Sequence, residues 1–402
     1  MEGRFNIIMF INANELDYSC ASNRNSMPFI LSLAKNMKDT GKVLVVTHYI
    51  PLLLAPILHP IEFIRYLIGS SINKVTDNLY VYTPSIPLNL TLAEKLPFML
   101  RLCQKYFKYF LRKKLQSLGF SSDIPRIMFV THPFHIYYVG LAEEDLIVYK
   151  CCDDFARMNQ NEPDQHILEL EGRLAVASDV VLATAQTLFE RLKAKSCTYY
   201  FPNAVDFELF NQTRLSRTPV ASELLDIPKP IIGFVGNLSS WYDFALLHEI
   251  ISKRVEWSFV FVGEIAQNVR KIVKSLETLP NTFFLGWKDY YSLPSFLKGI
   301  DVVIMPYKNN EFMQSVDPCK MYQFMAAGLP IVSTPIPQIL KFKNVIMIAE
   351  DAESFIKAIE RSISSHNCLK LAEQITLARK ESWDERAKVA LRLIQEKLDT
   401  KL

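Results

Sequence analysis

The sequence lacks the short motifs that mark several large enzyme classes. It contains no Gly-x-Gly-x-x-Gly segment and no Walker loop, so a dinucleotide oxidoreductase or a P-loop NTPase is a poor fit. It contains no Asp-x-Asp motif and no Cys-x-x-Cys pair. The seven cysteines are scattered without the spacing of metal ligands, which indicates reduced thiols and no metal site.

Long hydrophobic runs are also missing. The longest apolar stretch, Tyr49–Ile61, is interrupted by Pro51, Pro56 and Pro60 and is too short to span a bilayer. The N-terminus runs directly into an apolar strand-like segment, without the h-region or cleavage site of a signal peptide. The net charge of +3 gives no reason to expect a nucleic-acid partner. We therefore expect a cytoplasmic protein without a transmembrane helix.

Short apolar runs recur along the 402 residues, and each is divided from the next by a helical or polar segment. This rhythm is typical of doubly wound parallel sheets in an α/β protein, and the length suits two such domains. The predicted strands are 5–11, 42–47, 79–82, 126–131, 146–150, 180–183, 231–235, 257–262, 282–285, 301–305, 331–334 and 345–348. The polar segment Asn211–Lys229 carries three nearby prolines and predicts the linker. We expect a first domain over 1–210, a linker over 211–229, a second domain over 230–380 and a C-terminal helix within 381–402.

The stretch from 301 to 334 carries the strongest signals for a binding site. It predicts a buried strand, a polar loop, a helix and a second strand, and loops at the carboxyl ends of parallel strands are where such folds bind ligands. Asp317 is expected as the N-cap and Pro318 as the first helical residue. Lys320 and Gln323 then share one helix face, so a phosphate site at the helix N-terminus is plausible. The alternative is that Lys320 is an ordinary solvated lysine.

The residues of this stretch, Asp-Pro-x-Lys-x-Tyr-x-Phe-x-Ala-Ala-Gly-x-Pro-Ile-Val, resemble the donor-site signature of GT-B glycosyltransferases of the family-4-like group. The matching positions are Asp317, Pro318, Lys320, Tyr322, Ala326, Ala327, Gly328 and Pro330. A second segment, 201–210 (FPNAVDFELF), resembles the family's segment between domains, with Ala204 in place of a glycine. The resemblance implies two Rossmann-like domains facing across a cleft, the first holding an acceptor and the second a nucleotide sugar. It also implies that the last helix returns to the first domain.

The resemblance implies a set of residues that bind the donor. Gly236 and Asn237 end a predicted strand, where the missing Cβ of glycine lets the backbone approach a ligand closely; a tight turn is the alternative. The expected donor-binding residues are Gly236, Asn237, Tyr307, Asp317, Lys320, Tyr322 and Gln323. The nucleotide sugar, expected to be a UDP-sugar, is a substrate, and neither a cofactor nor a metal ion is expected.

Two departures from the family pattern argue against a retaining enzyme. No lysine or arginine follows Gly236 before Lys253, and Pro318 stands where the retaining signature has its second glutamate, seven residues after Glu311. The Lys-x-x-Gln pair and a Tyr-x-x-x-Asp-Asp stretch at 149–154 look more like xanthan-type glucuronosyltransferases and teichuronic-acid-type transferases. In the former group, a first-domain aspartate is the base.

An inverting transfer needs a base that deprotonates the acceptor hydroxyl. Asp154 and Asp153 follow a predicted strand and are candidates, with Asp154 preferred. The alternative is that one aspartate caps a helix while the other pairs with Arg157. His132 and His135, after the strand 126–131, are rivals, because an unperturbed histidine has a suitable pKa.

The segment Lys95–Lys114 holds seven basic residues and no acidic one. Its basic residues and its aromatic and leucine residues form adjacent stripes on a predicted helix. Such a helix can lie on an anionic leaflet, although a solvated helix above a core has the same pattern. Peripheral attachment to the inner face of the membrane is therefore one expectation.

Together these observations predict a glycosyltransferase that moves a sugar from a nucleotide-diphosphate donor to a glycan or lipid-linked acceptor. Cell-surface polysaccharide synthesis is the expected context, and inversion the expected stereochemistry. Two alternatives of other classes remain: a UDP-sugar 2-epimerase, which shares the fold, and a catalytically inactive GT-B partner subunit.

Overall fold

The computed structural model describes residues 4–11, 26–47, 50–51, 72–86, 94–158, 162–364 and 368–401. The chain forms two compact units. Unit 1 comprises Met1–Asp17, Phe29–Phe201 and Ala387–Leu402, and unit 2 comprises Tyr18–Pro28 and Pro202–Arg386. Within the described ranges, no helix is both long enough and apolar enough to cross a bilayer.

Unit 1 is built on an eight-stranded sheet with the order β10-β9-β8-β7-β1-β2-β5-β4. Its strands are β1 (Asn6–Phe10), β2 (Val43–Val46), β4 (Ile72–Lys74), β5 (Leu79–Tyr82), β7 (Arg126–Val130), β8 (Leu146–Cys151), β9 (Val180–Ala183) and β10 (Thr198–Tyr200). Every pair is parallel except the edge pair β4 and β5. Two short strands, β3 (Ile50–Pro51) and β6 (Ser85–Ile86), pair separately. β2 is a continuous apolar run, β1 and β7 are apolar after Asn6 and Arg126, and all three strands are buried, as expected of parallel strands covered on both faces.

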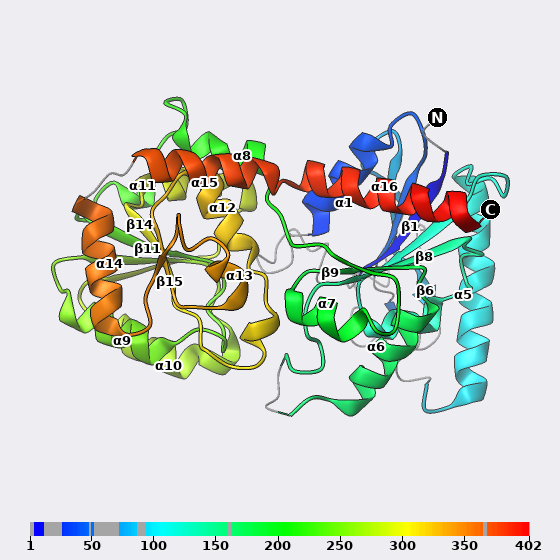
Figure 1. Cartoon of the computed structure of the whole chain (residues 1–402), viewed down its shortest axis with the longest axis horizontal. Helices are drawn as coiled ribbons and strands as arrows, with labels where there is room; N and C mark the ends of the chain where they lie inside the picture. Colours follow the sequence, from blue (N-terminus) through cyan, green and yellow to red (C-terminus); the bar gives the residue numbers. More distant parts are fainter. Residues whose placement is uncertain are drawn as a thin grey trace. The chain divides into compact units, whose positions relative to one another are not determined.

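The helices of unit 1 connect these strands and cover the sheet. They are α1 (Ser26–Asn36), α5 (Pro97–Ser117), the 3-10 helix η2 (Pro133–Tyr138), α6 (Gln165–Ala177) and α7 (Gln186–Leu192). Figure 1 shows α1 on one face of the sheet and α6 and α7 on the other. The last helix, α16 (Trp383–Lys401), begins in unit 2 and belongs to unit 1 from Ala387 onward.

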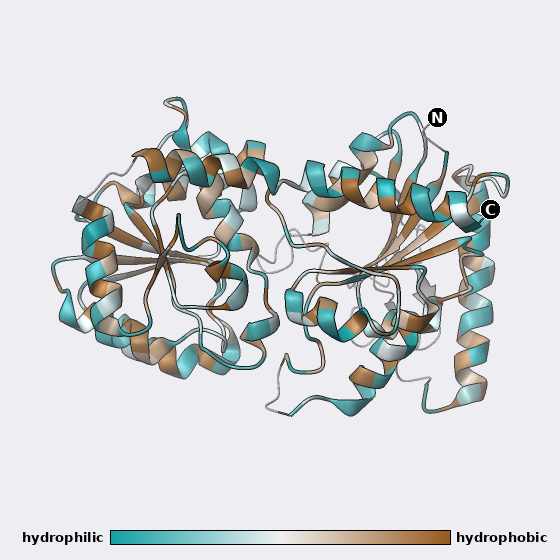
Figure 2. Ribbon diagram, in the orientation of Figure 1, coloured by the Kyte–Doolittle hydropathy of each residue, from teal (hydrophilic) through white to brown (hydrophobic). Residues whose placement is uncertain are grey.

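Unit 2 is built on a six-stranded parallel sheet with the order β13-β12-β11-β14-β15-β16. Its strands are β11 (Ile231–Val235), β12 (Ser258–Val262), β13 (Thr282–Gly286), β14 (Val302–Met305), β15 (Ile331–Ser333) and β16 (Met347–Ile348). Its α-helices are α8 (Phe207–Asn211), α9 (Phe244–Lys253), α10 (Arg270–Glu277), α11 (Leu293–Gly299), α12 (Cys319–Ala327), α13 (Pro337–Leu340), α14 (Ala352–Ser364) and α15 (Cys368–Lys380). Short 3-10 helices are η3 (Gln212–Arg214), η4 (Ser222–Leu224), η5 (Gln267–Val269), η6 (Tyr290–Ser292) and η7 (Met313–Ser315). In Figure 2 the strands of both sheets are brown, whereas the helices carry teal residues on their outer sides.

The predicted linker over 211–229 is wrong. The chain passes from unit 1 to unit 2 at Phe201 and Pro202, and residues 211–229 lie inside unit 2. Leu224 is buried in the core of unit 2, and its Cδ1 lies 2.6 Å from where a Cβ on Gly299 would be. The prolines of this segment therefore lie beside 3-10 turns that pack within unit 2. Such turns and a free linker have the same sequence pattern of polar residues and prolines, so the sequence does not distinguish them.

Each sheet has one point at which its strand order reverses. In unit 1 the reversal lies between β1 and β7, and in unit 2 it lies between β11 and β14. Open α/β sheets bind ligands in the crevice outside the carboxyl ends of the strands at such a point. Ligand-binding residues are therefore expected after β7 in unit 1 and after β11 and β14 in unit 2.

Candidate active site

In unit 2 the structure brings Gly236 and Lys320 together. Gly236 directly follows β11, has a φ of 142° and donates its N–H to the carbonyl of Val262 at 2.7 Å. A Cβ on Gly236 would lie 1.4 Å from Nζ of Lys320, which reaches this point from α12. The absence of a Cβ therefore gives the lysine its place at the reversal point of the sheet.

A second glycine, Gly263, supports this arrangement, and the sequence analysis missed it. Gly263 follows β12 and has a φ of 148°. A Cβ on it would lie 2.1 Å from the carbonyl oxygen of Gly236. The two backbone segments approach so closely that only glycine fits. The signal was present, because each of the two neighbouring strands is followed directly by a glycine.

Three polar groups here lack partners within the described part of the chain. Nζ of Lys320 lies 6.0 Å from the ring centroid of Phe234 and contacts no carboxylate. Gln323, one turn further along the same helix, is only 8% exposed, and its amide makes no hydrogen bond to a described residue. Oδ1 of Asn237 is buried without a hydrogen-bond partner. Buried polar atoms are rarely left unpaired in proteins, and Oδ1 of Asn237 is such an atom. Together with the half-buried Lys320, it is typical of a place where a polar ligand binds.

Asp317 does not cap α12, which corrects the prediction from sequence. The N-cap is Pro318, and no side chain bonds to the first turn. Instead, Oδ2 of Asp317 accepts the N–H of Asn203 at 2.6 Å, and its Oδ1 accepts the hydroxyl of Tyr322 at 3.1 Å. The Asn203 side-chain amide donates to the Asp317 carbonyl at 2.8 Å. This buried clamp joins the segment after Pro202 to α12.

Burial raises the pKa of Asp317 to about 6, although the hydrogen bonds from Asn203 and Tyr322 oppose the shift. Both Asp317 and Tyr322 are buried, and their polar atoms bind each other and Asn203. The structure thus gives these two predicted donor-binding residues a place in the interior. From this position they hold the start of α12 against the segment after Pro202.

Tyr307 is also an interior residue. Its ring stacks on Tyr242 with 5.0 Å between centroids, and its N–H donates to Oγ1 of Thr334 at 2.9 Å. Burial raises the pKa of its phenol well above the ordinary value. The side chain therefore fixes the loop after β14.

In unit 1, His132 lies at the reversal point, directly after β7. Its Nδ1 accepts the N–H of Phe134 at 3.2 Å, and its ring packs on Phe155 with 4.4 Å between centroids. A neutral ring that accepts at Nδ1 carries its proton on Nε2. This tautomer makes Nε2 a donor, which suits holding a substrate oxygen better than removing a proton. His135 is buried, and its Nδ1 accepts the N–H of Thr131 at 3.2 Å.

Asp154 is held in a buried ion-pair network. Its Oδ2 lies 3.0 Å from Nη1 of Arg157 and 3.1 Å from Nη1 of Arg191. Its Oδ1 is buried without a partner in the described part of the chain, and the residue is 1% exposed. The pairing with Arg157 is the structural alternative from the sequence, and the second arginine strengthens it. A carboxylate enclosed in this way has no open path to an acceptor hydroxyl.

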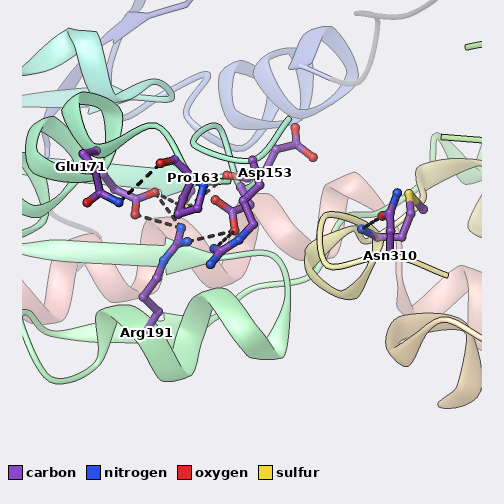
Figure 3. A network of polar contacts seen from close by, with 10 residues as sticks. Asp153, Pro163, Glu171, Arg191 and Asn310 are labelled. Carbon is purple, nitrogen blue, oxygen red and sulfur yellow. Dashed lines mark hydrogen bonds and ion pairs between the residues drawn. The ribbon is translucent and has the colours of Figure 1, made fainter. Parts of the chain in front are cut away.

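Arg191 extends the network to Glu171, and sequence reasoning missed both residues. Nη2 of Arg191 lies 2.9 Å from Oε2 of Glu171, while Oε1 of Glu171 accepts the hydroxyl of Tyr149 at 3.3 Å. Burial raises the pKa of Glu171, and the charge of Arg191 opposes the rise. Figure 3 shows Arg191 reaching from its helix to a point between Glu171 and the loop that carries Asp153. A glutamate inside an apolar helix face, next to Leu170, was the available signal.

Asp153 is the more accessible of the two neighbouring aspartates. It is half-buried, whereas Asp154 is fully buried. Asp154 pairs with both arginines of the network. The two adjacent carboxylates at the end of β8 thus have different surroundings. No three histidine, cysteine or carboxylate side chains gather as metal ligands anywhere in the described ranges.

Comparison with known proteins agrees with the motifs and the fold. Residues 229–365 match a family model described as glycosyl transferases group 1. The chain is 25% identical over 274 residues to TuaH of Bacillus subtilis (strain 168), a glycosyltransferase named for teichuronic acid biosynthesis; the match covers 64% of this chain and 68% of that protein.

Two solved structures show the same fold over the whole chain. Sucrose-phosphate synthase from Thermosynechococcus elongatus has a TM-score of 0.73 at 13% identity, covering 99% of this chain and 100% of its own. Anabaena HepE in complex with UDP and glucose has a TM-score of 0.63 at 13% identity, with 98% and 100% covered. The two-domain α/β fold predicted from sequence is confirmed, and residues 229–365 are similar to the glycosyl transferases of group 1.

Proposed function

We propose that the chain is a glycosyltransferase that binds a UDP-sugar in unit 2, with the diphosphate at Lys320, and transfers the sugar to a hydroxyl of a glycan or lipid-linked acceptor. The observation that carries the proposal is the position of Lys320, whose Nζ lies over Gly236 without a carboxylate partner among the described residues. A lysine in the first turn of a helix, at the carboxyl end of a parallel sheet, supplies the charge that a diphosphate needs. The amide of Gln323 and Oδ1 of Asn237 supply further polar contacts.

The leaving group requires charge neutralisation in the transition state. As the bond between the anomeric carbon and the diphosphate oxygen breaks, the electron pair and a negative charge go to UDP. Lys320 and the N-terminal N–H groups of α12 stabilise that charge. The proposal therefore needs neither a metal ion nor a cofactor.

We assign the base to Asp153, because Asp154 is enclosed by two arginines. The acceptor oxygen forms the new bond to the anomeric carbon while Asp153 takes its proton. This attack opposite the leaving diphosphate inverts the anomeric configuration. His132, with its proton on Nε2, can hold an acceptor oxygen in place. Arg191 and Glu171 act as positioning residues for the loop.

The choice of donor and pathway draws on the relatives. The HepE structures contain UDP and UDP-glucose, and TuaH is named for teichuronic acid biosynthesis. These names support a UDP-sugar donor and a cell-surface polysaccharide as the context.

Turnover tests the proposal directly. Purified protein is incubated with a panel of UDP-sugars and with a lipid extract or oligosaccharide acceptors, and UDP release and the anomeric configuration of the product are measured by NMR. UDP release that requires an acceptor, with inversion, is expected. A UDP-sugar epimerised without an acceptor identifies an isomerase, and failure to bind any nucleotide identifies an inactive partner subunit.

The two aspartates give matched variants for the base. Asp153→Asn is expected to lower kcat at least about 100-fold while UDP still binds, because proton transfer contributes 10²–10⁴ in typical enzymes. Asp154→Asn is expected to reduce stability and to retain more activity than Asp153→Asn. If Asp153→Asn kept full activity, the assignment of the base would be wrong.

A further inference from the structure

Helix α5 has one face that packs against the core of unit 1 and one that does not. The packed row consists of Cys103, Phe107, Leu111 and Leu115, which are four residues apart and fully buried. Figure 1 shows α5 along the outer edge of unit 1, beyond the sheet. Burial of this row fixes α5 against unit 1. The opposite face of the helix does not pack against the core.

Apolar side chains occupy the middle of the open face. Phe98 is 76% exposed, Leu102 48% and Tyr109 53%. At about 100° per residue, these three positions fall within about 40° of one another, and their middle lies about 180° from the middle of the packed row. An apolar line directly opposite the core is unusual for a surface helix, which normally presents polar residues there.

Basic side chains flank this apolar line. Arg101, Lys105 and Arg112 lie on one side and are exposed, and none has a carboxylate partner within the described part of the chain. Lys113 lies on the other side, 4.5 Å from the ring centroid of Tyr109. Lys108, in contrast, turns toward the body of unit 1 and lies 3.6 Å from Glu143. The cations of the open face are thus the unpaired ones.

We propose that this face, consisting of Phe98, Arg101, Leu102, Lys105, Tyr109, Arg112 and Lys113, docks on a membrane surface that contains anionic lipids. Apolar side chains at the centre enter the boundary between headgroups and acyl chains, while flanking lysines and arginines reach lipid phosphates. The segment from Lys95 to Lys114 has no acidic residue to repel them. The charge pattern therefore fits an anionic bilayer.

Docking of α5 on a membrane would also place the proposed acceptor-binding residue His132 close to the lipid. The side-chain amide of Gln104 donates to the carbonyl of Tyr137 at 2.8 Å, and Nζ of Lys108 donates to the carbonyl of Gly140 at 3.3 Å. These contacts tie α5 to η2, the turn that begins directly after His132, and to Gly140 just beyond its end. A lipid-linked acceptor would then be presented near the helix that contacts the lipid. This link rests on the proposed function, whereas the docking itself does not.

Flotation with vesicles tests the docking. Full-length protein is mixed with vesicles of phosphatidylcholine alone, or with about one third phosphatidylglycerol, and the floated fraction is measured at low and high salt. Binding is expected only to the anionic vesicles, with a loss in about 0.5 M NaCl because salt screens the lipid charge. The variant R101Q/K105Q/R112Q is expected to bind at least about tenfold more weakly, and F98S/L102S/Y109S to lose binding as well.

A matched control removes the same charge elsewhere. R270Q/K271Q/K274Q neutralises three exposed cations of α10 in unit 2 and is expected to float like the wild type. All variants alter exposed side chains, and thermal unfolding verifies that each is folded. Equal loss in the α10 variant would show an effect of net charge and overturn the proposal, as would failure of the wild type to float. If the wild type failed to float but self-associated, and the α5 variants abolished that, the face would belong to a second copy. UDP binding is measured in parallel, so failure of docking is distinguished from failure of the donor site.

Discussion

The polar residues at the carboxyl ends of the two sheets differ in whether they have protein partners. In unit 2, Lys320, Gln323 and Oδ1 of Asn237 lack protein partners among the described residues. In unit 1, Asp154 and Glu171 are already joined through Arg191. Charges that pair with each other stabilise a fixed geometry, whereas unpaired polar groups in a buried place gain their partners from a ligand.

This difference distinguishes residues that bind the nucleotide from residues that hold other side chains in position. Substitutions in the network of unit 1 should act first on stability, because they leave a buried charge without its partner. Substitutions around Lys320 should act first on nucleotide affinity, because few protein contacts are lost.

Arg191→Met should break the network of unit 1. Asp154 and Glu171 have side chains only 2% and 5% exposed, and each would lose its contact to this guanidinium. The expected cost is about 3–5 kcal/mol in the free energy of unfolding, measured by denaturant titration. Arg157→Met removes an arginine that pairs with Asp154 and is more exposed than Arg191, so it is the matched control with a smaller expected effect. A loss below about 1 kcal/mol for Arg191→Met would show that the network does not stabilise unit 1.

Asp317→Asn should remove a pH dependence of stability from unit 2. The folded pKa of about 6 exceeds the ordinary 3.8, so the folded state binds the proton more tightly. The resulting stability is fully present below about pH 3.8 and is lost as the pH rises through about 6. The difference of about 2.2 pH units corresponds to about 3 kcal/mol at 1.36 kcal/mol per unit.

The measurement is the free energy of unfolding of wild type and Asp317→Asn between pH 4 and 7.5. Relative to the variant, the wild type should become less stable as the pH rises. A difference that stayed constant over this range would contradict the raised pKa.

Gly236→Ala should displace Lys320, because the new Cβ would meet its Nζ at 1.4 Å. The expected result is a loss of UDP affinity of at least about tenfold, roughly 1.4 kcal/mol. Gly286→Ala provides the control: its φ of 67° also disfavours a side chain, but nothing lies within 4 Å of the added Cβ. The control should lose about 1–2 kcal/mol of stability from backbone strain and keep its affinity. If wild type and Gly236→Ala bound UDP with equal affinity, Gly236 would not be part of the donor site.

Much of the fold could be predicted from the sequence, because buried parallel strands read as short apolar runs. β1, β11 and β14 are of this kind, and each was predicted to within a residue or two. The predicted linker failed because the apolar Leu224, which fixes its segment to unit 2, is isolated among polar residues. The polar segment 12–25 lies outside the described residues.

The candidate site was predictable where it depends on neighbours in sequence. Lys320 and Gln323 share a helix face by spacing alone, and Gly236 was marked by its place after a strand. The interior roles of Asp317 and Tyr307 depend on Asn203 and Tyr242, which lie far away in the sequence. Likewise, the enclosure of Asp154 depends on Arg191 of α7. Contacts of this range leave no periodic pattern, so the sequence, which favoured Asp154 as the base, gave no sign that this residue is the enclosed one.

Calorimetric titration of UDP without metal ions, in the presence of EDTA, is the direct test of the placement of the diphosphate at Lys320. The proteins are the wild type, Lys320→Ala and Lys274→Ala, the last removing an exposed lysine of α10. We predict micromolar binding to the wild type and Lys274→Ala, and binding at least about tenfold weaker, roughly 1.4 kcal/mol, to Lys320→Ala. Equal affinity of all three proteins, or no binding of UDP to the wild type, would contradict the placement of the diphosphate at Lys320.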